Sequence, residues 1–312
     1  MLHWVLAGIG DIAKKRVMPA IQAEPRSELY GVVTRDPDKG ARYAPRVWSN
    51  YDEALADPKV DAVYIATPVS LHAPQSIAAL KAGKHVLCEK PVALTYDEAM
   101  AMKTASERAS KVLGIAYYRR TYPKVLRAKA LLAEEVIGRP VLAEISCHDW
   151  FNAEAGREWL IDPAMSGGGP FFDIGSHRID LLNDFFGEPL TVAAQRSNHV
   201  HGRAVEDSAT VLIEYASGVR GIVDVRWHCR QGRDDFRITG TEGVMDLSPL
   251  NGPSLRYQNR EESIPTHANL HYPCVENFVA HILDGSPLRA SAESSIATDW
   301  VTARAMASSQ RP

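Results

Sequence analysis

The first third of the chain alternates short, almost wholly apolar runs with stretches of helical spacing. The apolar runs cover residues 2–7, 29–33, 62–66, 85–88 and 112–117. The helical stretches lie at about 12–23, 52–56, 74–82 and after Thr95, where Glu98 three residues on predicts a capping box. Pro19 is expected to bend the first of these helices or to loosen its last turn. Strands without polar alternation that are separated by helices are typical of parallel sheets, so the pattern predicts a doubly wound α/β sheet.

After about residue 120 the pattern changes to extended segments, several of which alternate apolar and polar residues. They lie at 141–146, 192–197, 209–215, 221–227, 236–238 and 244–247, with a hairpin turn at Ser217-Gly218. Helical spacing at about 123–132, 175–186 and 274–283 interrupts them, and a last helix is expected from about Glu293 towards Ser309. We therefore predict a Rossmann-type domain at residues 1–119 and an α+β domain at residues 120–312, whose sheet is large, open and mostly antiparallel.

Composition narrows the class of protein. The 312 residues carry a formal net charge of −3 and no basic block, which argues against nucleic-acid binding. No apolar run approaches the roughly 18 residues of a membrane span, and the strand-like start leaves no room for a signal peptide. The four cysteines are far apart, and neighbours such as Cys147-His148 have no spaced partner set, so neither a disulfide framework nor a metal site is expected. We predict a soluble, cytoplasmic protein.

A glycine-containing segment, Gly8-Ile9-Gly10-Asp11-Ile12-Ala13, lies between the first predicted strand and the first predicted helix. In that context Gly8 permits a tight turn and Gly10 lets the backbone approach a pyrophosphate, while the small Ala13 allows close packing of the helix on the strand. The anion rests on the helix N-terminus, where unpaired N–H groups favour it. The segment therefore predicts a dinucleotide-binding loop, with a plain strand–helix turn as the alternative.

The end of the second strand bears on which dinucleotide is bound. NAD enzymes carry an acidic residue about 20 positions beyond the glycine segment, where it holds the ribose hydroxyls. Thr34 occupies that place here, with Arg35 beside it. A hydroxyl and a guanidinium bind a 2′-phosphate that a carboxylate repels, so NADP is favoured. NAD stays the alternative, since Asp36 takes the acidic role if the strand end shifts.

Two further sets of residues carry candidate chemistry. Lys90 follows the apolar run 85–88 and precedes Pro91, which places its amine at the carboxyl edge of the predicted sheet, where open α/β sheets bind ligands. Downstream, Asp173, His177 and Asp180 share one face of a predicted helix after Gly167-Gly168-Gly169, whose glycines suit a close approach to a ligand. A solvated lysine, a helix-capping aspartate and a core histidine are the alternative interpretations.

The order of these segments resembles the Gfo/Idh/MocA family of oxidoreductases. The resemblance rests on GIGDIA, the Thr67-Pro68 strand end followed by His72, Glu89-Lys90-Pro91 and GGGPFFDIGSHRID, and it extends to ITGTEG at 238–243. It implies hydride transfer between a nicotinamide cofactor, NADP by the residues at the second strand end, and a sugar, polyol or related compound, and a homodimer or homotetramer formed through the C-terminal sheet. It also implies that Lys90 and His177 meet beside the nicotinamide with Asp173 close by, and that one of Lys90 and His177 is the acid/base.

Further residues receive roles from this resemblance or from their position. Glu89 contacts the nicotinamide side in the family, and Thr67, Ser70 and His72 line the cofactor channel, although Ser70 departs from the asparagine-rich form of that loop. Tyr118, Arg120 and Trp159 suit the binding of a polyhydroxylated substrate, with interdomain packing as the equal alternative. Two other functions remain open: a glycosidase that uses a retained NAD as a transient redox sink, and a non-catalytic nucleotide sensor.

Overall fold

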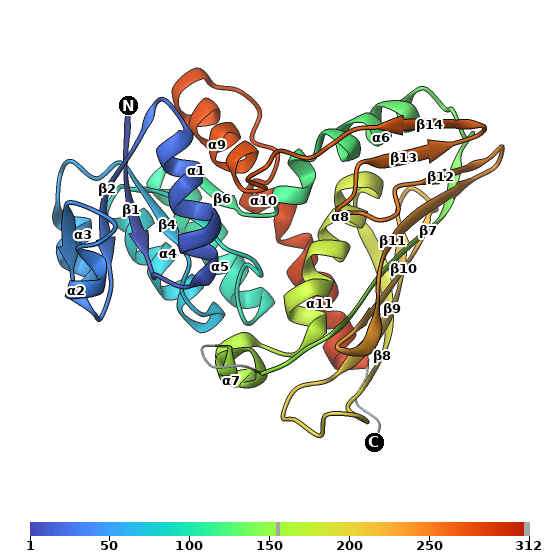
Figure 1. The fold of residues 1–312 in the computed structure, drawn as a ribbon, viewed down its shortest axis with the longest axis horizontal. Helices are drawn as coiled ribbons and strands as arrows, with labels where there is room; N and C mark the ends of the chain where they lie inside the picture. The colour runs from blue at the N-terminus through green and yellow to red at the C-terminus, as the bar shows by residue number, and fades with distance from the viewer. Residues whose placement is uncertain (154–156, 309–312) are drawn as a thin grey trace. The chain divides into compact units, whose positions relative to one another are not determined.

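The computed structural model describes residues 1–153 and 157–308 and divides them into two compact units (Figure 1). The first unit contains Met1–Tyr118 together with His267–Ile296. The second contains Arg119–Thr266 and the chain from Ala297 onward. The first boundary lies within one residue of the predicted one. The segment His267–Ile296 differs from the prediction, which placed all of residues 120–312 in the second domain.

The first unit is built on a parallel sheet. Its strands are β1 (Leu2–Ala7), β2 (Ser27–Val33), β3 (Arg46–Trp48), β4 (Ala62–Ile65), β5 (His85–Cys88) and β6 (Leu113–Ile115). The six strands lie in the order β3-β2-β1-β4-β5-β6, and every pair is parallel, which confirms the predicted doubly wound sheet. Its helical segments before residue 119 are η1 (Ala13–Val17), α1 (Met18–Ala23), α2 (Pro37–Gly40), α3 (Tyr51–Ala56), η2 (Val69–Leu71), α4 (His72–Lys81) and α5 (Tyr96–Ala109). The capping box of Thr95 and Glu98 is present at the start of α5.

The carboxyl ends of the strands lie at one level across this sheet. Ala7 pairs with Val33 and Ile65, Ile65 pairs with Cys88, and Cys88 pairs with Ile115. The residues that follow each strand therefore meet at a single edge. Strand order reverses beside β1, and that reversal is where open α/β sheets bind ligands.

The segment from His267 to Ile296 completes the core of the first unit. Its helix α9 (Tyr272–Asp284) carries Phe278, which is fully buried and packs against Trp4 of β1 with ring centroids 5.4 Å apart. A Cβ at Gly114 of β6 would lie 2.9 Å from the Phe278 ring, so the helix sits closely on the sheet. The backbone N–H of Ile115 donates to the Ala290 carbonyl at 2.9 Å, ahead of the short helix α10 (Ala292–Ser295). These contacts explain why the segment belongs to the first unit.

Pro19 has a visible effect on the first helix. The turn just before it, η1, is a π-helical turn, and α1 follows with the proline at its start. In a regular α-helix the proline ring clashes with the carbonyl four residues earlier, and the wider turn relieves that clash. The expected loosening therefore falls before the proline rather than in the last turn of the helix.

The second unit is built on an eight-stranded sheet. The strands are β7 (Pro140–Trp150), β8 (Pro189–Ser197), β9 (Ser208–Tyr215), β10 (Arg220–Arg226), β11 (His228–Gly240), β12 (Val244–Asp246), β13 (Ser254–Tyr257) and β14 (Arg260–Ser263). Their order is β14-β13-β12-β11-β7-β10-β9-β8, and β7 with β10 is the parallel pair among antiparallel ones, as the prediction of a mostly antiparallel sheet requires.

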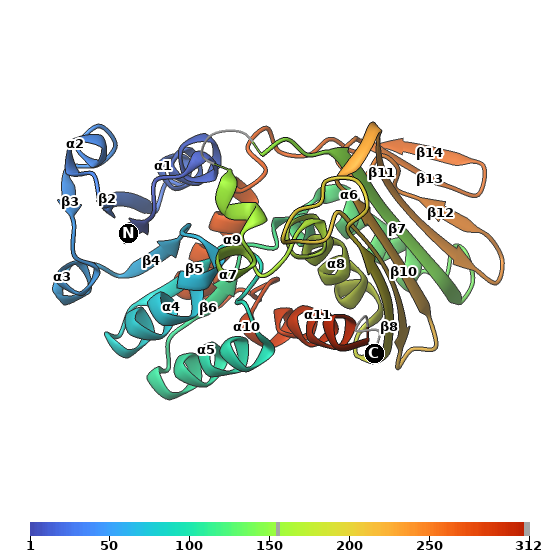
Figure 2. The ribbon, with the colours of Figure 1, turned by 90° about the horizontal axis from the view of Figure 1, so that it is seen from below.

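Helices cover one face of this second sheet. Figure 2 shows α8 (Ser176–Phe186) and α11 (Ala297–Ser308) on the same side of the strands. The remaining helical segments are η3 (Tyr118–Thr121), which begins at the unit boundary, α6 (Pro123–Ala133), η4 (Glu158–Ile161), α7 (Pro163–Ser166) and η5 (Phe171–Gly175). The last predicted helix is divided into α10 and α11, and its expected end at Ser309 lies outside the described residues. No helix in the described part of the chain is long and apolar enough to cross a membrane.

Candidate active-site residues

The loop after β1 has the geometry of a dinucleotide-binding turn. Gly8 has a φ of +93°, and a Cβ on it would lie 2.7 Å from the Ala66 carbonyl oxygen, so the fold itself requires glycine there. Gly10 is different, because a Cβ on it would meet no described atom within 4 Å. The protein leaves open space at the position where the backbone of such a loop approaches a pyrophosphate. The loop therefore fits a dinucleotide.

The residues around these glycines divide between core and surface. Ile9 is buried, whereas Asp11 and Ile12 are exposed at the start of the first helix. The Asp11 carboxylate pairs with Lys15 at 3.1 Å and Lys14 at 3.2 Å, and the hydrogen bond from Lys15 is the main reason that the pKa of Asp11 is lowered. The two ammonium groups and this carboxylate together leave one net positive charge in the first turns of the helix, at the end where an anion is expected.

The second strand, β2, is followed by Thr34 and Arg35, which carry a hydroxyl and a guanidinium. Thr34 is half-buried, and its Oγ1 accepts a hydrogen bond from the Asp36 N–H at 3.2 Å. Arg35 is exposed. The Asp36 carboxylate accepts from the Lys39 N–H at 3.0 Å and so caps the short helix α2. Asp36 therefore has a structural role after the strand end, and no carboxylate occupies the Thr34 position.

The loop after β4 is held to the loop after β5 by His72. The ring is buried, with Nε2 at 3.0 Å from the Thr67 carbonyl oxygen and Nδ1 at 2.9 Å from that of Pro91. Burial lowers the pKa of His72. The Thr67 hydroxyl donates to the Gln75 side chain at 2.7 Å, and Ser70 lies half-buried in η2. A neutral imidazole has one N–H, so His72 donates to one of these two carbonyls and lies against the other. The cofactor contacts of Thr67, Ser70 and His72 stay a prediction.

Lys90 is the second residue after β5 and has a cis peptide bond to Pro91. The preceding Glu89 is 7% exposed, and its carboxylate faces protein groups. Glu89 Oε1 accepts from the Tyr64 hydroxyl at 2.8 Å and lies 3.2 Å from His271 Nε2, while Oε2 lies 3.3 Å from the Lys90 N–H. Burial alone would raise the pKa of Glu89, but the hydrogen bond and charge of His271, with help from Tyr64 and Lys90, lower it below its usual value. The cofactor contact expected of Glu89 stays a prediction.

In the second unit the residues from Phe171 to Phe186 form one helical stretch that begins with the π turn η5. Asp173 lies half-buried in this turn, and His177 is 4% exposed in the first turn of α8. A π turn contains more residues than a regular α-helical turn. Asp173 and His177 are therefore separated by a widened turn, whereas the sequence prediction placed them one regular turn apart.

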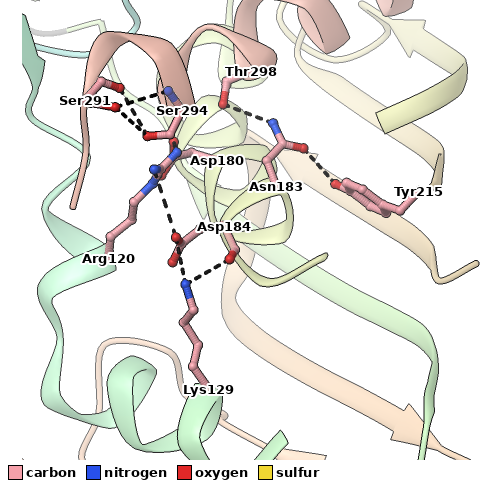
Figure 3. A network of polar contacts seen from close by, with 9 residues as sticks. All are labelled: Arg120, Lys129, Asp180, Asn183, Asp184, Tyr215, Ser291, Ser294 and Thr298. Atoms are coloured by element: carbon pink, nitrogen blue, oxygen red, sulfur yellow. Dashed lines mark hydrogen bonds and ion pairs between the residues drawn. The ribbon is translucent and has the colours of Figure 1, made fainter. Parts of the chain in front are cut away.

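Asp180 and Arg120 form a buried ion pair in the same unit (Figure 3). Arg120 donates from Nε at 2.9 Å and from Nη2 at 2.5 Å to the two oxygens of the Asp180 carboxylate, and both side chains are 2% exposed or less. Burial raises the pKa of Asp180 to about 6, against the opposing effect of Arg120. Lys129 pairs with Asp184 at 2.8 Å one turn further on. The guanidinium that was predicted to bind substrate thus has a protein partner, and a role in substrate binding stays a prediction.

The glycines before this helix pack against protein. A Cβ at Gly169 would lie 2.0 Å from the Glu206 carbonyl oxygen, and one at Gly167 would lie 2.4 Å from the Phe172 ring. The buried Glu206 carboxylate accepts from the N–H groups of Gly169 at 2.9 Å and Phe171 at 3.1 Å. Burial raises its pKa. Glu206 therefore holds the start of the stretch that carries Asp173 and His177, and these glycines are explained by that packing.

The aromatic candidates lie against neighbours within their own units. Tyr118 packs on the His271 ring with centroids 4.5 Å apart. Trp159 lies half-buried against an apolar cluster that includes Phe151 and Trp227. Within the described residues, no group of three or more histidine, cysteine, aspartate or glutamate side chains is placed to hold a metal ion.

Three buried residues next to the candidate site were not found by sequence reasoning. Tyr64 and His271 hold the Glu89 carboxylate, and Glu206 holds the glycine stretch. Tyr64 lies inside an apolar strand, and His271 is 182 positions from Glu89. No local pattern connects such distant residues. Of the three, only Glu206 lies near a recognisable local pattern, because it stands just before β9, a strand in which buried and exposed residues alternate.

An edge of parallel strands with a glycine-containing loop and a lysine suits a nucleotide-dependent enzyme. Comparison with known families agrees: the profile of the oxidoreductase family with an NAD-binding Rossmann fold matches residues 2–117, and that of the GFO/IDH/MocA C-terminal domain matches residues 125–246. The chain belongs to the Gfo/Idh/MocA family of oxidoreductases, and its first unit contains an NAD-binding Rossmann fold.

Individual relatives extend over nearly the whole chain. The 1,5-anhydro-D-fructose reductase of Ensifer adhaerens is 31% identical and covers 99% of this chain and 98% of its own. The D-xylose 1-dehydrogenase (NADP(+)) 2 of Haloferax volcanii is 30% identical over 78% of this chain and 75% of its own. Among solved structures, a levoglucosan dehydrogenase in complex with NADH and levoglucosan has a TM-score of 0.88 at 25% identity, covering 98% of this chain and 96% of that one.

Proposed function

We propose that this protein transfers a hydride between NADP and a carbon of a sugar, polyol or related hydroxy or keto compound. The observation that carries the proposal is the common level of the strand ends, which puts Gly8, Thr34, Thr67 and Lys90 along one edge of one sheet. Two interstrand spacings, about 10 Å, separate β1 from β5. Lys90 therefore lies beyond the pyrophosphate loop along the cofactor's path. Relatives named as sugar reductases and dehydrogenases support the substrate class.

The chain's own residues divide the work of binding. The backbone of residues 8–12 holds the pyrophosphate, and Thr34 with Arg35 holds the 2′-phosphate of NADP. Thr67, Ser70 and His72 line the path to the nicotinamide, beside Glu89. The bound cofactor supplies or accepts the hydride.

Lys90, His177 and Asp173 handle the substrate oxygen. Lys90 donates a hydrogen bond to it and stabilises the negative charge that develops there. His177 exchanges the hydroxyl proton, because an imidazole serves as acid or base near neutral pH. Asp173 orients a neighbouring hydroxyl, and Tyr118, Arg120 and Trp159 contribute to the substrate pocket.

The test is a fluorescence titration with NADPH and NADH, followed by a panel of sugars and polyols assayed through the absorbance of reduced nicotinamide. Turnover of an alcohol or carbonyl on this panel, with free exchange of cofactor, supports the proposal. Release of sugar from glycosides with no net cofactor reduction would instead indicate the redox-sink glycosidase.

Arg35→Asp tests the preference for NADP. We expect NADPH binding to weaken at least tenfold more than NADH binding, because the variant replaces a cation next to the 2′-phosphate by an anion. Equal losses for the two cofactors would remove Arg35 from the 2′-phosphate site.

Lys90→Met tests the chemical role of the amine. We expect turnover to be abolished while NADPH still quenches protein fluorescence as in the wild type. An active Lys90→Met variant would exclude the role proposed for Lys90.

We also propose that the protein forms a homo-oligomer through the uncovered face of the second sheet. Ala193, Leu212 and Ile222 are cross-strand neighbours on β8, β9 and β10, and Leu212 is 43% exposed. An apolar row on an open sheet is a typical interface feature. Leu212→Glu is expected to yield monomers in light scattering, and an unchanged oligomer would place the interface elsewhere.

A further inference from the structure

The turn that carries Lys90 rests on a buried carboxylate. Glu89 precedes the lysine at the end of β5, and both of its oxygens have partners within the first unit. Tyr64 from the adjacent strand β4 donates to Oε1, and the backbone N–H of Lys90 points at Oε2. The position of the lysine backbone is thus coupled to the position of this carboxylate.

The groups around the Glu89 carboxyl favour its ionised form. Its pKa is lowered although burial opposes ionisation, because His271, Tyr64 and Lys90 favour the charged form. A buried anion is costly unless it is paired or hydrogen-bonded, so each donor around it contributes to holding it in place.

His271 is the donor that comes from outside the sheet. It precedes α9 and is 2% exposed, and its ring packs on that of Tyr118 at 4.5 Å. A carboxylate oxygen has no proton to give, so Nε2 carries the proton of the 3.2 Å contact with Glu89. Nδ1 is buried and has no hydrogen-bond partner among the described residues. Among the described residues, the contact with Glu89 is therefore the one side-chain hydrogen bond of this ring.

We propose that His271 is a positioning residue of the active site: by donating to the Glu89 carboxylate it fixes the turn at Lys90, and with it the direction of the catalytic amine. This inference rests on the proposed function, in which the Lys90 amine contacts the substrate oxygen. His72 holds the same turn from the other side through the Pro91 carbonyl. The turn is thus held at Glu89 by α9 and at Pro91 by α4.

The experiment compares two replacements of His271. His271→Phe keeps a ring against Tyr118 but removes the N–H donor, and His271→Gln keeps a donor without the ring. We expect His271→Phe to lower kcat at least tenfold with the NADPH dissociation constant within twofold of the wild type, and His271→Gln to recover most of the loss. Hydrogen–deuterium exchange of the peptide spanning residues 86–94 should rise in His271→Phe and fall again in His271→Gln.

A matched control and a second route keep the test decisive. His281 lies on α9, the helix that follows His271, and contacts the Ser286 carbonyl at 2.6 Å, so His281→Gln should change neither kcat nor the exchange of that peptide. If His271→Phe does not fold, Tyr64→Phe removes the other side-chain donor to Glu89 and should act in the same direction. A normal kcat, or normal exchange at residues 86–94, in the folded donor-less variant overturns the proposal. Absence of turnover in the wild type itself counts against the proposed function instead.

Discussion

Gly8 and Gly10 stand two positions apart in one loop, and replacing each by alanine should have opposite consequences. At Gly8 the added Cβ would lie 2.7 Å from a backbone oxygen, on a residue whose φ is +93°. At Gly10 the Cβ would meet no described atom within 4 Å, and the φ of this residue is not positive. Gly8 is therefore required by the fold, whereas at Gly10 the fold leaves room for a Cβ, and we expect a bound dinucleotide to be what requires glycine there.

The magnitudes follow from these contacts. Holding alanine in the Gly8 conformation costs about 1–3 kcal/mol before the clash with Ala66 is added, so Gly8→Ala should lose at least about 2 kcal/mol of unfolding free energy. Gly10→Ala should be neutral or gain up to about 1 kcal/mol, because alanine reduces the entropy of the unfolded chain. If its methyl group displaces the pyrophosphate from one backbone N–H, a charge-assisted hydrogen bond of about 1.5–3 kcal/mol is lost, which corresponds to about 10- to 150-fold in affinity.

Urea unfolding of both variants without nucleotide, together with NADPH titration by fluorescence, measures the two quantities separately. Gly10→Ala with wild-type affinity for NADPH would refute the assignment of this loop to the pyrophosphate. Gly10→Ala with a large loss of stability would instead show that protein atoms occupy the space above the loop.

Three further predictions concern the cores that support the site. Phe278→Ala should destabilise the first unit by about 3–5 kcal/mol in urea unfolding, since the ring is fully buried against Trp4; a loss below about 1 kcal/mol would mean that α9 is dispensable. Glu206→Ala should cost about 2–4 kcal/mol, because it leaves two backbone N–H groups without their acceptor, and it should also lower kcat through Asp173 and His177; unchanged kinetics would separate Glu206 from the site. Lys124 is fully buried, donates to three backbone carbonyls at 2.6–2.8 Å, and has its pKa lowered by burial to about 8. The ordinary pKa of a lysine is 10.5, so between pH 8 and pH 10.5 the unfolded chain binds more protons at this position than the folded chain. The unfolding free energy of the wild type, measured relative to that of Lys124→Met, should therefore rise with pH across this window, and a fall would contradict the lowered pKa.

Local signals were sufficient to predict most of the first unit. The apolar run of β1 was predicted with its observed ends, and the capping box at Thr95 was recognised from two side chains three positions apart. Both depend on interactions within a few residues. The short strands β3 and β14 were not predicted, whereas β4 and β5 of similar length were, because only β4 and β5 belong to continuous apolar runs.

Long-range packing limited the rest. Phe278 fits an amphipathic helix in either unit, and only its contacts with Trp4 and the space above Gly114 decide where α9 belongs. The glycines at 167–169 suited a ligand as well as they suit the Phe172 ring and the Glu206 backbone. The apolar type of Phe278 indicated burial, and the glycines indicated a close approach of other atoms. Neither residue type identifies the group that it contacts.

The return of residues 267–296 to the first unit has a consequence for dissecting the molecule. The chain passes between the units at three places, after Tyr118, after Thr266 and after Ile296. A fragment that stops at residue 118 therefore exposes the apolar surface that Phe278 covers, and it also lacks His271. The smallest piece with a complete first core joins residues 1–118 to 267–296 through a short flexible linker. Residues 119–266 thus lie between β6 and α9 in the chain without interrupting the parallel sheet, all of whose strands precede Tyr118.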